Sequence, residues 1–238
     1  MNDSFRNYLN TWYATPSGAV FAKQMDDLLT PWLQGVFGYH GVQLGNFVPE
    51  TPLIRHARTN HTVIADCERD GGVCCTAEAM PFATDALDLL ILPHTLELSE
   101  DPRAVLREVD RVLVPDGRLL IIGMDPWTLW NGLQRLKGRR YPFHTQGRIK
   151  DWLDLLGLEQ ERSALLPVSR WNLPEWLARW PKTRQLGNLM ASNVAGGYAI
   201  MAQKRTTTMT TVRMRWRLKP RLVAGGFTRP AVRNGNHG

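Results

Sequence analysis

Long hydrophobic runs are missing from this sequence of 238 residues. Apolar stretches such as residues 89–92 and 119–122 are far shorter than the roughly 20 residues that a transmembrane helix needs. The first ten residues, MNDSFRNYLN, also lack the basic and apolar regions of a secretory signal. We therefore expect no membrane span and a cytoplasmic protein.

Cysteine is scarce, with only Cys67, Cys74 and Cys75 in the chain. Because the number is odd and two of the three are adjacent, a repeated disulfide framework is excluded. No C-x-x-C spacing is available for a zinc or redox site, so no metal is predicted. The three thiols are expected to be small core residues in a reducing compartment.

Acidic residues are absent from the C-terminal part of the chain. The net charge is +7, but from Lys204 onward the chain contains nine Lys or Arg and no Asp or Glu. The first 203 residues therefore contain 20 basic and 22 acidic residues, a balance of −2. We expect a mostly disordered basic tail at 205–238. Its alternating segment VRMRWRL, residues 212–218, would suit an edge strand, RNA or anionic lipid. A nucleic-acid partner of the folded body is not favoured.

Strands alternate with amphipathic helices in the rest of the chain. Helices are predicted at 17–33, 101–114 and 145–157, and strands at 41–44, 61–66, 72–82 with its outgoing loop, 86–94, 118–123 and 198–203. The expected N-caps are Ser17, Asp101 and Thr145, Gly157 is the expected helix stop, and VPDG at 114–117 fits a type I turn. This alternation predicts a doubly wound α/β sheet of mainly parallel strands.

In such sheets ligands bind at the edge formed by the carboxyl ends of the strands. Four residues would lie at that edge: Gly45, Asp66, Thr76 and Pro93. A single glycine such as Gly45 is more often only turn punctuation. Asp66 comes 21 residues later, a spacing at which an acid accepts hydrogen bonds from both ribose hydroxyls of a nucleotide cofactor, although such aspartates also cap helices.

Residues 77–127, AEAMPFATDALDLLILPHTLELSEDPRAVLREVDRVLVPDGRLLIIGMDPW, closely resemble the central block of class I S-adenosylmethionine-dependent methyltransferases. The nearest branch is the small bacterial type 11 group, which includes the ubiquinone and menaquinone biosynthesis methyltransferases. The match lies in the order of Met-Pro-Phe, an Asp-led strand, an H-x-L-E turn, the helix L-R-E-V-x-R-V-L and Pro-x-Gly. It covers roughly residues 40–203.

The resemblance implies a Rossmann-like sheet of seven strands, mainly parallel with an antiparallel last strand. It divides the chain into an N-terminal helical segment at 1–36, a methyltransferase domain at 37–204 and the basic tail at 205–238. The implied cofactor is S-adenosyl-L-methionine, and the implied partner is a small-molecule substrate that the sequence does not identify.

The resemblance also implies a set of site residues. The residues expected to bind the cofactor are Gln43, Gly45, Asn46, Asp66, Thr76, Ala77, Glu78, Leu92 and His94. In this scheme Gly45 lies beside the methionine part, Asp66 holds the ribose, and Thr76 to Glu78 border the adenine. Leu92 and His94 would line the floor near the reacting methyl group. His94 is the candidate catalytic base, with a packing role as the alternative.

The chain departs from the family pattern at the glycine turn. Gln43 replaces the usual acid, and Asn46, Phe47, Val48 and Pro49 follow Gly45 in place of further glycines. Thr76 likewise replaces the acid of the adenine loop. Three functions therefore stay open: a methyltransferase for a small molecule, a methyltransferase-like scaffold that has lost catalysis, and an RNA-directed methyltransferase guided by its tail.

Tryptophans gather in two further segments. Trp176 and Trp180 share one face of an insertion at 167–188, where packing onto the body and a lid over the substrate are alternative roles. Trp127 and Trp130 follow the strand at 118–123 and would form the opposite wall. His144, next to the Thr145 cap, could enter the pocket from above, but a position in a solvated loop is expected.

Overall fold

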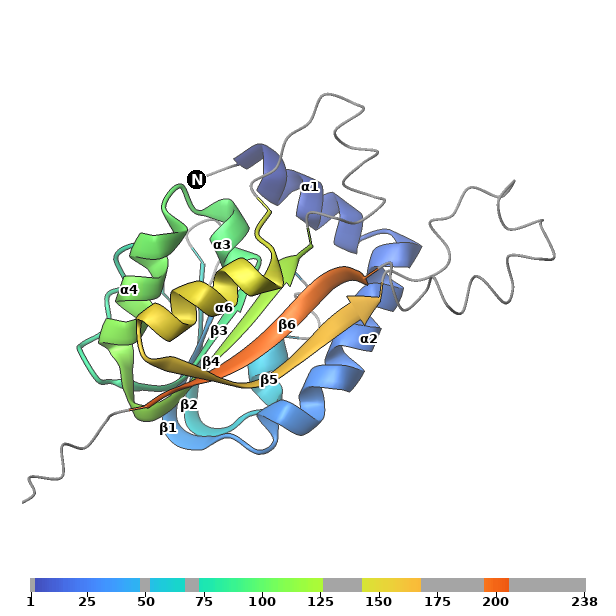
Figure 1. The fold of residues 1–238 in the computed structure, drawn as a ribbon. Coiled ribbons are helices and arrows are strands. Elements are labelled where there is room, and N and C mark those ends of the chain that lie inside the picture. Colours follow the sequence, from blue (N-terminus) through green and yellow to red (C-terminus); the bar gives the residue numbers. More distant parts are fainter. Residues whose placement is uncertain (1–2, 48–51, 67–72, 126–142, 168–194, 206–238) are drawn as a thin grey trace, which may run out of the picture. The chain divides into compact units, whose positions relative to one another are not determined.

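A six-stranded sheet forms the centre of the molecule, with the strand order β2-β1-β3-β4-β6-β5 (Figure 1). The structure is a computed structural model that describes residues 3–47, 52–66, 73–125, 143–167 and 195–205. The strands are β1 (Phe37–Leu44), β2 (Arg58–Ala65), β3 (Leu87–Pro93), β4 (Leu113–Met124), β5 (Leu158–Pro167) and β6 (Ala195–Lys204). The helices are α1 (Asp3–Tyr13), α2 (Pro16–Leu33), η1 (Leu53–His56), α3 (Thr95–Leu98), α4 (Pro102–Val112) and α6 (Gln146–Leu155).

The sheet is mainly parallel, as predicted. Strands β2, β1, β3 and β4 are parallel neighbours, whereas β6 pairs antiparallel with both β4 and β5. The doubly wound α/β class and the antiparallel last strand are therefore confirmed. The described residues form six strands rather than the expected seven.

The missing strand is the one predicted at 72–82. Val73 makes a single parallel bridge with Ala65, and Thr76 makes a single bridge with Ala79. The chain turns at residues 77–78, between the two partners of the second bridge, so the described residues 73–79 form no strand on the free edge of β2. Predicting a strand there was wrong because the β-branched and cysteine residues at 73–76 are followed at once by a turn.

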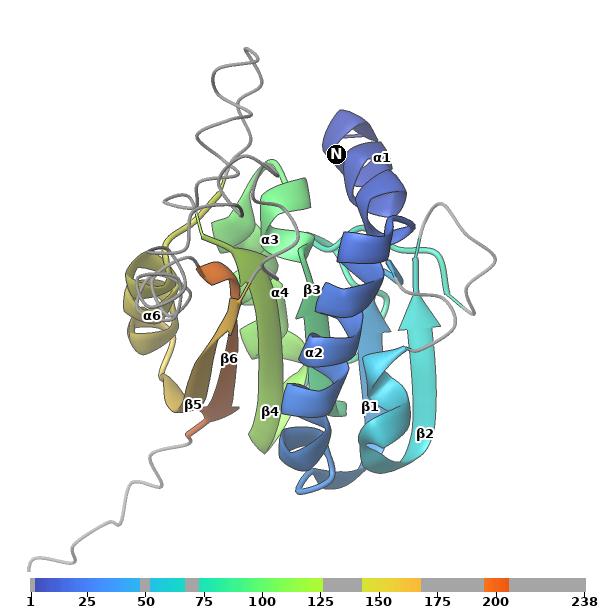
Figure 2. The ribbon, with the colours of Figure 1, turned by 90° about the vertical axis from the view of Figure 1, so that its right-hand side faces the viewer.

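Helices cover both faces of the sheet (Figure 2). On one face, apolar residues of α1 and α2 pack with Leu89 and Ile91 of β3. On the other face, residues of α4 and α6 pack with the alternating positions Leu90 and Leu92. These four consecutive residues, 89–92 of β3, are fully buried. Burial on both faces is typical of a central parallel strand.

Local capping explains where the helices begin. Asp101 accepts hydrogen bonds from the backbone N–H groups of Arg103 and Ala104 at 3.0 and 3.1 Å, and Thr145 accepts one from Arg148. Both caps were predicted from the sequence. The Ser17 cap was wrong: Thr15 caps α2, because Pro16 is already the first helical residue. Helix α1 lies within the predicted N-terminal helical segment at 1–36, but it was not predicted as a separate helix.

The VPDG segment is not a type I turn. It lies within β4, where the register with β3 jumps from Leu87–Leu113 to Leu89–Arg118. Asp116, the third residue of the segment, has φ of 63°. A type I turn needs a negative φ at that position, so this sequence interpretation was wrong.

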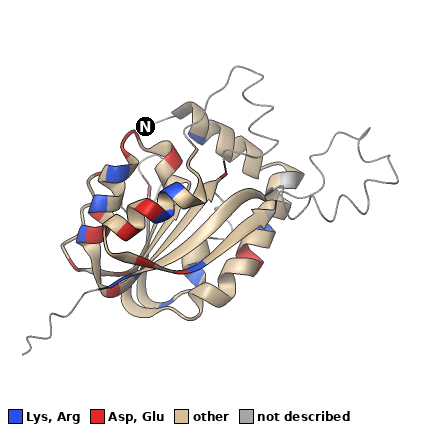
Figure 3. Ribbon diagram, viewed as in Figure 1, with Lys and Arg blue, Asp and Glu red and all other residues tan. Residues whose placement is uncertain are grey.

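Charges of both signs are distributed along α4 and α6 (Figure 3). Of the helices within the described ranges, none has the length and apolar character needed to cross a bilayer. The tryptophans at 127, 130, 171, 176 and 180 and the basic tail from residue 206 lie outside the described residues. The proposals made for them stay predictions.

Candidate functional site

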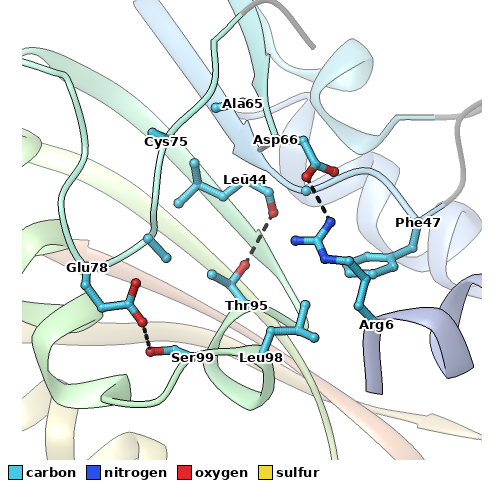
Figure 4. Close-up of a pocket in the computed structure, with 12 residues that line it drawn as sticks. Arg6, Leu44, Phe47, Ala65, Asp66, Cys75, Glu78, Thr95, Leu98 and Ser99 are labelled. Atoms are coloured by element: carbon cyan, nitrogen blue, oxygen red, sulfur yellow. Dashed lines mark hydrogen bonds and ion pairs between the residues drawn. The ribbon is translucent and has the colours of Figure 1, made fainter. Parts of the chain in front are cut away.

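A pocket lies at the carboxyl ends of β1 and β2 (Figure 4). Four of the residues expected to bind a cofactor line it: Gly45, Asp66, Ala77 and Glu78. They come from segments that follow β1 and β2 in the chain, so the parallel topology brings them together as anticipated. Arg6 and Phe47 also line the pocket, and neither was predicted.

Gly45 makes the turn that leaves β1. Its φ is 86°, a region that favours glycine, and its N–H donates to the carbonyl oxygen of Ala65 at 2.8 Å. A Cβ atom on Gly45 would lie 3.4 Å from Cε2 of Phe47. The aromatic ring therefore lies directly against the turn, where the family pattern has further glycines.

Asp66 follows β2 and its side chain is buried. Its carboxylate oxygen Oδ1 accepts a hydrogen bond from Nη1 of Arg6 at 2.8 Å, which is also a buried ion pair. Its backbone N–H donates to the carbonyl oxygen of Val73 at 3.0 Å, which fixes the end of the strand. The carboxylate and the guanidinium are both drawn at the same side of the pocket (Figure 4).

The side chain of Gln43 forms its hydrogen bonds within the loop and does not line the pocket. Its Nε2 donates to the carbonyl oxygen of Gly45 at 2.9 Å, and its Oε1 accepts from the N–H of Ile54 at 3.1 Å. The side chain is 2% exposed. Gln43 thus holds the chain around the turn, and together with Asn46, Thr76 and Leu92 it does not belong to the pocket lining.

The opposite rim is formed by the short turn after the Thr76 bridge. The N–H of Ala79 donates to the carbonyl oxygen of Thr76 at 3.2 Å, which places Ala77 and Glu78 at the pocket. The carboxylate of Glu78 accepts a hydrogen bond from the hydroxyl of Ser99. An acidic group therefore faces the pocket from each of two sides.

His94 is fully buried and does not line the pocket. Its φ is 53°, in the left-handed region that few non-glycine residues adopt. Its Nε2 lies 2.8 Å from the phenolic oxygen of Tyr13, and its backbone N–H donates to Ile122 at 2.8 Å. Burial lowers the pKa of His94 to about 4. At neutral pH the ring is therefore uncharged.

Glu97 is a buried acid that sequence reasoning did not select. Only 1% of it is exposed, and its Oε1 accepts from the N–H of Met124 at 2.8 Å, which ties α3 to the end of β4. Burial raises the pKa of Glu97 to about 7. Burial and the Glu97 charge also raise the pKa of the phenols of Tyr13 and Tyr198. The H-x-L-E motif contained this residue, but the motif alone did not indicate a buried carboxyl group.

His144 does not enter the pocket either. Its ring packs against Trp152 of α6 in an edge-on arrangement, with 5.1 Å between the ring centroids. Burial, with a smaller contribution from Arg148, lowers the pKa of His144. The expectation of a solvated loop was wrong, because the side chain is half-buried against a helix.

The comparisons with known proteins agree with this geometry. A family model described as a methyltransferase domain matches residues 54–121. The match begins after the altered turn at Gly45. The uncharacterized protein YafS of Escherichia coli (strain K12) is 31% identical over 230 residues, which are 92% of this chain and 91% of that protein.

Two solved structures show the same fold at low sequence identity. A chain of the complex between the Haloferax volcanii Trm112 methyltransferase activator and a methyltransferase matches with a TM-score of 0.58 and 12% identity, covering 83% of this chain and 98% of that chain. Geranyl diphosphate C-methyltransferase of Streptomyces coelicolor A3(2), in complex with S-adenosyl-L-homocysteine, matches with a TM-score of 0.54 and 14% identity, covering 77% and 80%. The chain is thus of the same family as YafS, its residues 54–121 belong to the type 11 methyltransferase domain family, and its fold is that of the class I methyltransferases.

Proposed function

We propose that this protein transfers a methyl group from S-adenosyl-L-methionine to a small-molecule acceptor. The observation that carries the proposal is the position of Asp66, whose buried carboxylate faces the same pocket as the turn at Gly45. The solved relative in complex with S-adenosyl-L-homocysteine supports the same cofactor class. The scaffold and RNA-directed alternatives gain no support from the described residues.

The pocket residues fit the adenosine part of this cofactor. A ribose diol needs acceptor oxygens, and the Asp66 carboxylate provides them. Leu44, Ala77 and Leu98 give the pocket apolar surface, and Glu78 provides an acceptor at the rim for an amino group such as that of adenine. We therefore assign Gly45, Asp66, Ala77 and Glu78 to cofactor binding.

Four other expected cofactor residues do not line the pocket. Gln43 and Thr76 hold the two loops through their hydrogen bond and bridge, and Leu92 is a fully buried strand residue. Asn46 connects Gly45 to Phe47 in the chain. We propose that these residues shape the site without touching the ligand.

The bound cofactor supplies an electrophilic methyl group, so the protein mainly has to orient the acceptor and exclude water. A proton acceptor is needed only when the acceptor atom carries a proton. His94 is a poor base for this step, because its pKa of about 4 means that it holds a proton weakly at neutral pH. We propose that His94 positions Tyr13 and α1 at the carboxyl edge of the sheet.

Calorimetric titration with S-adenosyl-L-homocysteine tests the cofactor assignment. The full chain should bind it, and Asp66→Asn should weaken binding by about 10- to 100-fold, because a hydrogen bond to a charged group contributes about 1.5–3 kcal/mol. Asp27→Asn, at an exposed position of α2, is the matched control and should bind as the unaltered chain does. No heat from the unaltered chain at high ligand concentration would overturn the proposed function.

We also propose a boundary for the catalytic domain. Residues 37–204 carry the sheet and all of the pocket-lining residues except Arg6 of α1, and we assign the basic segment 205–238 to a separate tail. Deleting 206–238 should leave the affinity for S-adenosyl-L-homocysteine unchanged. A loss of affinity in the shortened chain would place part of the site in the tail.

A further inference from the structure

The pocket at the carboxyl ends of β1 and β2 is too small in this conformation for a whole adenosyl ligand. Its cavity has a volume of about 40 Å³. Sites that enclose drug-sized ligands measure about 300–1,000 Å³. Part of the lining must therefore move before such a ligand can enter.

Arg6 is the lining residue that can move most easily. The strand ends that form the rest of this side are fixed by hydrogen bonds. The N–H of Gly45 donates to the carbonyl oxygen of Ala65 at 2.8 Å, and the hydroxyl of Thr95 donates to that of Leu44 at 3.3 Å. Arg6 instead reaches the pocket from α1 through a long side chain with several rotatable bonds.

The Arg6 guanidinium also occupies the group that the proposed cofactor needs. Its Nη1 donates to Oδ1 of Asp66 at 2.8 Å, and the residue is 8% exposed. The Cζ atom of Arg6 lies 5.8 Å from the centroid of the Phe47 ring, over its face. The three side chains lie together on one side of the pocket (Figure 4). Charge and an aromatic ring thus hold the guanidinium where a ribose would meet the carboxylate.

Helix α1 itself is held more firmly than this side chain. Phe5 and Leu9 are fully buried in the core. The phenolic oxygen of Tyr13 lies 2.8 Å from Nε2 of His94. Lifting the helix would expose both apolar side chains to water, whereas rotating Arg6 leaves them in place. Moving the one side chain is therefore the less costly way to enlarge the pocket.

We propose that the Arg6–Asp66 ion pair is an autoinhibitory contact, in which Arg6 competes with the ribose of an adenosyl ligand for the Asp66 carboxylate. The inference rests on the proposed function, because it takes Asp66 to be the ribose acceptor. The ligand binds only while the guanidinium is turned away. Its apparent affinity is therefore reduced by the fraction of molecules in which the contact is open.

A shared carboxylate is the alternative arrangement. An ionised carboxylate has about four lone-pair positions, so one acid can accept from a guanidinium and a ribose together. In that arrangement the guanidinium supports the bound state, and its loss leaves the affinity unchanged or lowers it. The competing arrangement predicts the opposite sign, because loss of the guanidinium then raises the affinity.

The test is calorimetric titration of S-adenosyl-L-homocysteine into the full chain and into Arg6→Met. Methionine keeps an unbranched apolar stem at this position without the charge. Arg6→Met should bind about 10-fold more tightly, since a charged hydrogen bond no longer opposes the ligand. Stopped-flow mixing should show the gain mainly as faster association, because the bound state of both proteins lacks the contact.

Three further variants control this measurement. Arg107→Met breaks the exposed ion pair with Asp101, away from the pocket lining, and should leave the affinity unchanged. In an Asp66→Asn background the contact has lost its acid, so adding Arg6→Met should change the affinity less than about threefold. Arg6→Lys keeps the charge but not the planar fork, so it should tighten binding by a smaller factor, and it tests the inference even if Arg6→Met unfolds.

The outcomes separate this inference from the proposed function. Unchanged or weaker binding by the Arg6 variants would overturn the inference while the proposed function stands. A gain from Arg6→Met that persists in full in the Asp66→Asn background would also overturn it, because the effect would then not act through the carboxylate. Absence of binding by the unaltered chain would overturn the proposed function itself.

Discussion

The phenolic oxygen of Tyr13 lies 2.8 Å from Nε2 of His94, which joins the end of α1 to the residue that follows β3. Seven residues earlier on the same helix, Arg6 pairs with Asp66 after β2. Residues seven apart share one face of a helix. Helix α1 therefore contacts the carboxyl edge of the sheet at two points and is part of the candidate site.

The hydrogen bond of Tyr13 should contribute measurably to stability. Tyr13→Phe removes only the hydroxyl and leaves Nε2 of His94 buried without that partner, so the free energy of unfolding should fall by about 1–3 kcal/mol. Tyr39→Phe is the matched control, because Tyr39 is 68% exposed. Urea unfolding measures both changes. Equal, small effects of the two substitutions would show that the buried contact makes no net contribution.

Backbone conformation at Gly45 predicts a cost for alanine. Its φ of 86° is unfavourable for a residue with a Cβ atom, so Gly45→Ala should lower the free energy of unfolding by about 1–2 kcal/mol. The new Cβ atom would meet Phe47 at 3.4 Å, which is ordinary contact and adds little. Gly157→Ala should cost about the same, because φ there is 73° and nothing lies within 4 Å.

Gly147 provides the contrasting control for this pair. It lies in α6 with no atom within 4 Å of an added Cβ, so alanine there should leave stability unchanged or raise it by up to about 1 kcal/mol. Chemical denaturation of Gly45→Ala, Gly157→Ala and Gly147→Ala measures the three changes in the free energy of unfolding. A much larger loss for Gly45→Ala than for Gly157→Ala would mean that the Phe47 ring cannot adjust.

Restoring the family's acid next to the turn should harm the protein. In Gln43→Glu the carboxylate can still accept from Ile54 but can no longer donate to the carbonyl oxygen of Gly45. The position is 2% exposed, so the buried charge should cost at least about 2 kcal/mol at pH 7. The cost should shrink as the pH falls, because the protonated acid is neutral and can donate to Gly45.

Thermal unfolding of Gln43→Glu at pH 5 and pH 8 measures this effect. Gln34→Glu, at an exposed position after α2, is the control and should change stability by less than about 0.5 kcal/mol. If Gln43→Glu is as stable as the unaltered chain at pH 8, water must reach the position, and the assignment of Gln43 to a closed loop is wrong.

Sequence patterns predicted the elements whose ends are set by local chemistry. Helix α4 has an Asp101 cap followed by proline, and α6 has a Thr145 cap and ends before Gly157 with its positive φ. The continuous apolar run of β3 likewise indicated burial on both faces. The spacing of Gly45 and Asp66 also indicated that the two residues meet at one edge of the sheet.

The contributions of α1 depend on tertiary contacts and were not predicted. Phe5, Leu9 and Tyr13 have helical spacing, but the sequence does not say that this helix docks at the carboxyl edge. Arg6 was missed for the same reason, since its partner is 60 residues away in the chain. His94 could not be assigned to the core rather than the pocket without knowing what covers it.

The buried acid Glu97 predicts a distinct dependence of stability on pH. Its pKa is about 7 in the folded protein against an ordinary value of 4.5, so between these values the folded state holds a proton that the unfolded state has lost. The free energy of unfolding therefore falls as the pH rises through this range, by about 3 kcal/mol in total, and the loss is complete above pH 7. Tyr13 and Tyr198, the neighbouring phenols with raised pKa values, stay protonated throughout.

His94 has the opposite effect on the dependence of stability on pH, over an overlapping pH range. The substitution Glu97→Gln should therefore make the contribution of His94 visible. Because the folded pKa of His94 is about 4 and its ordinary value is 6.5, the unfolded state binds the extra proton, and stability rises with pH between these values. The two slopes oppose each other in the unaltered chain.

Glu97→Gln keeps an acceptor for the N–H of Met124 and should gain stability relative to the unaltered chain from pH 5 to pH 7, reaching about 3 kcal/mol. Urea unfolding at pH 5, 6, 7 and 8 measures the difference, which for the exposed control Leu155→Ala should not depend on pH. A pH-independent difference for Glu97→Gln would mean that Glu97 ionises in the folded protein as readily as in the unfolded chain.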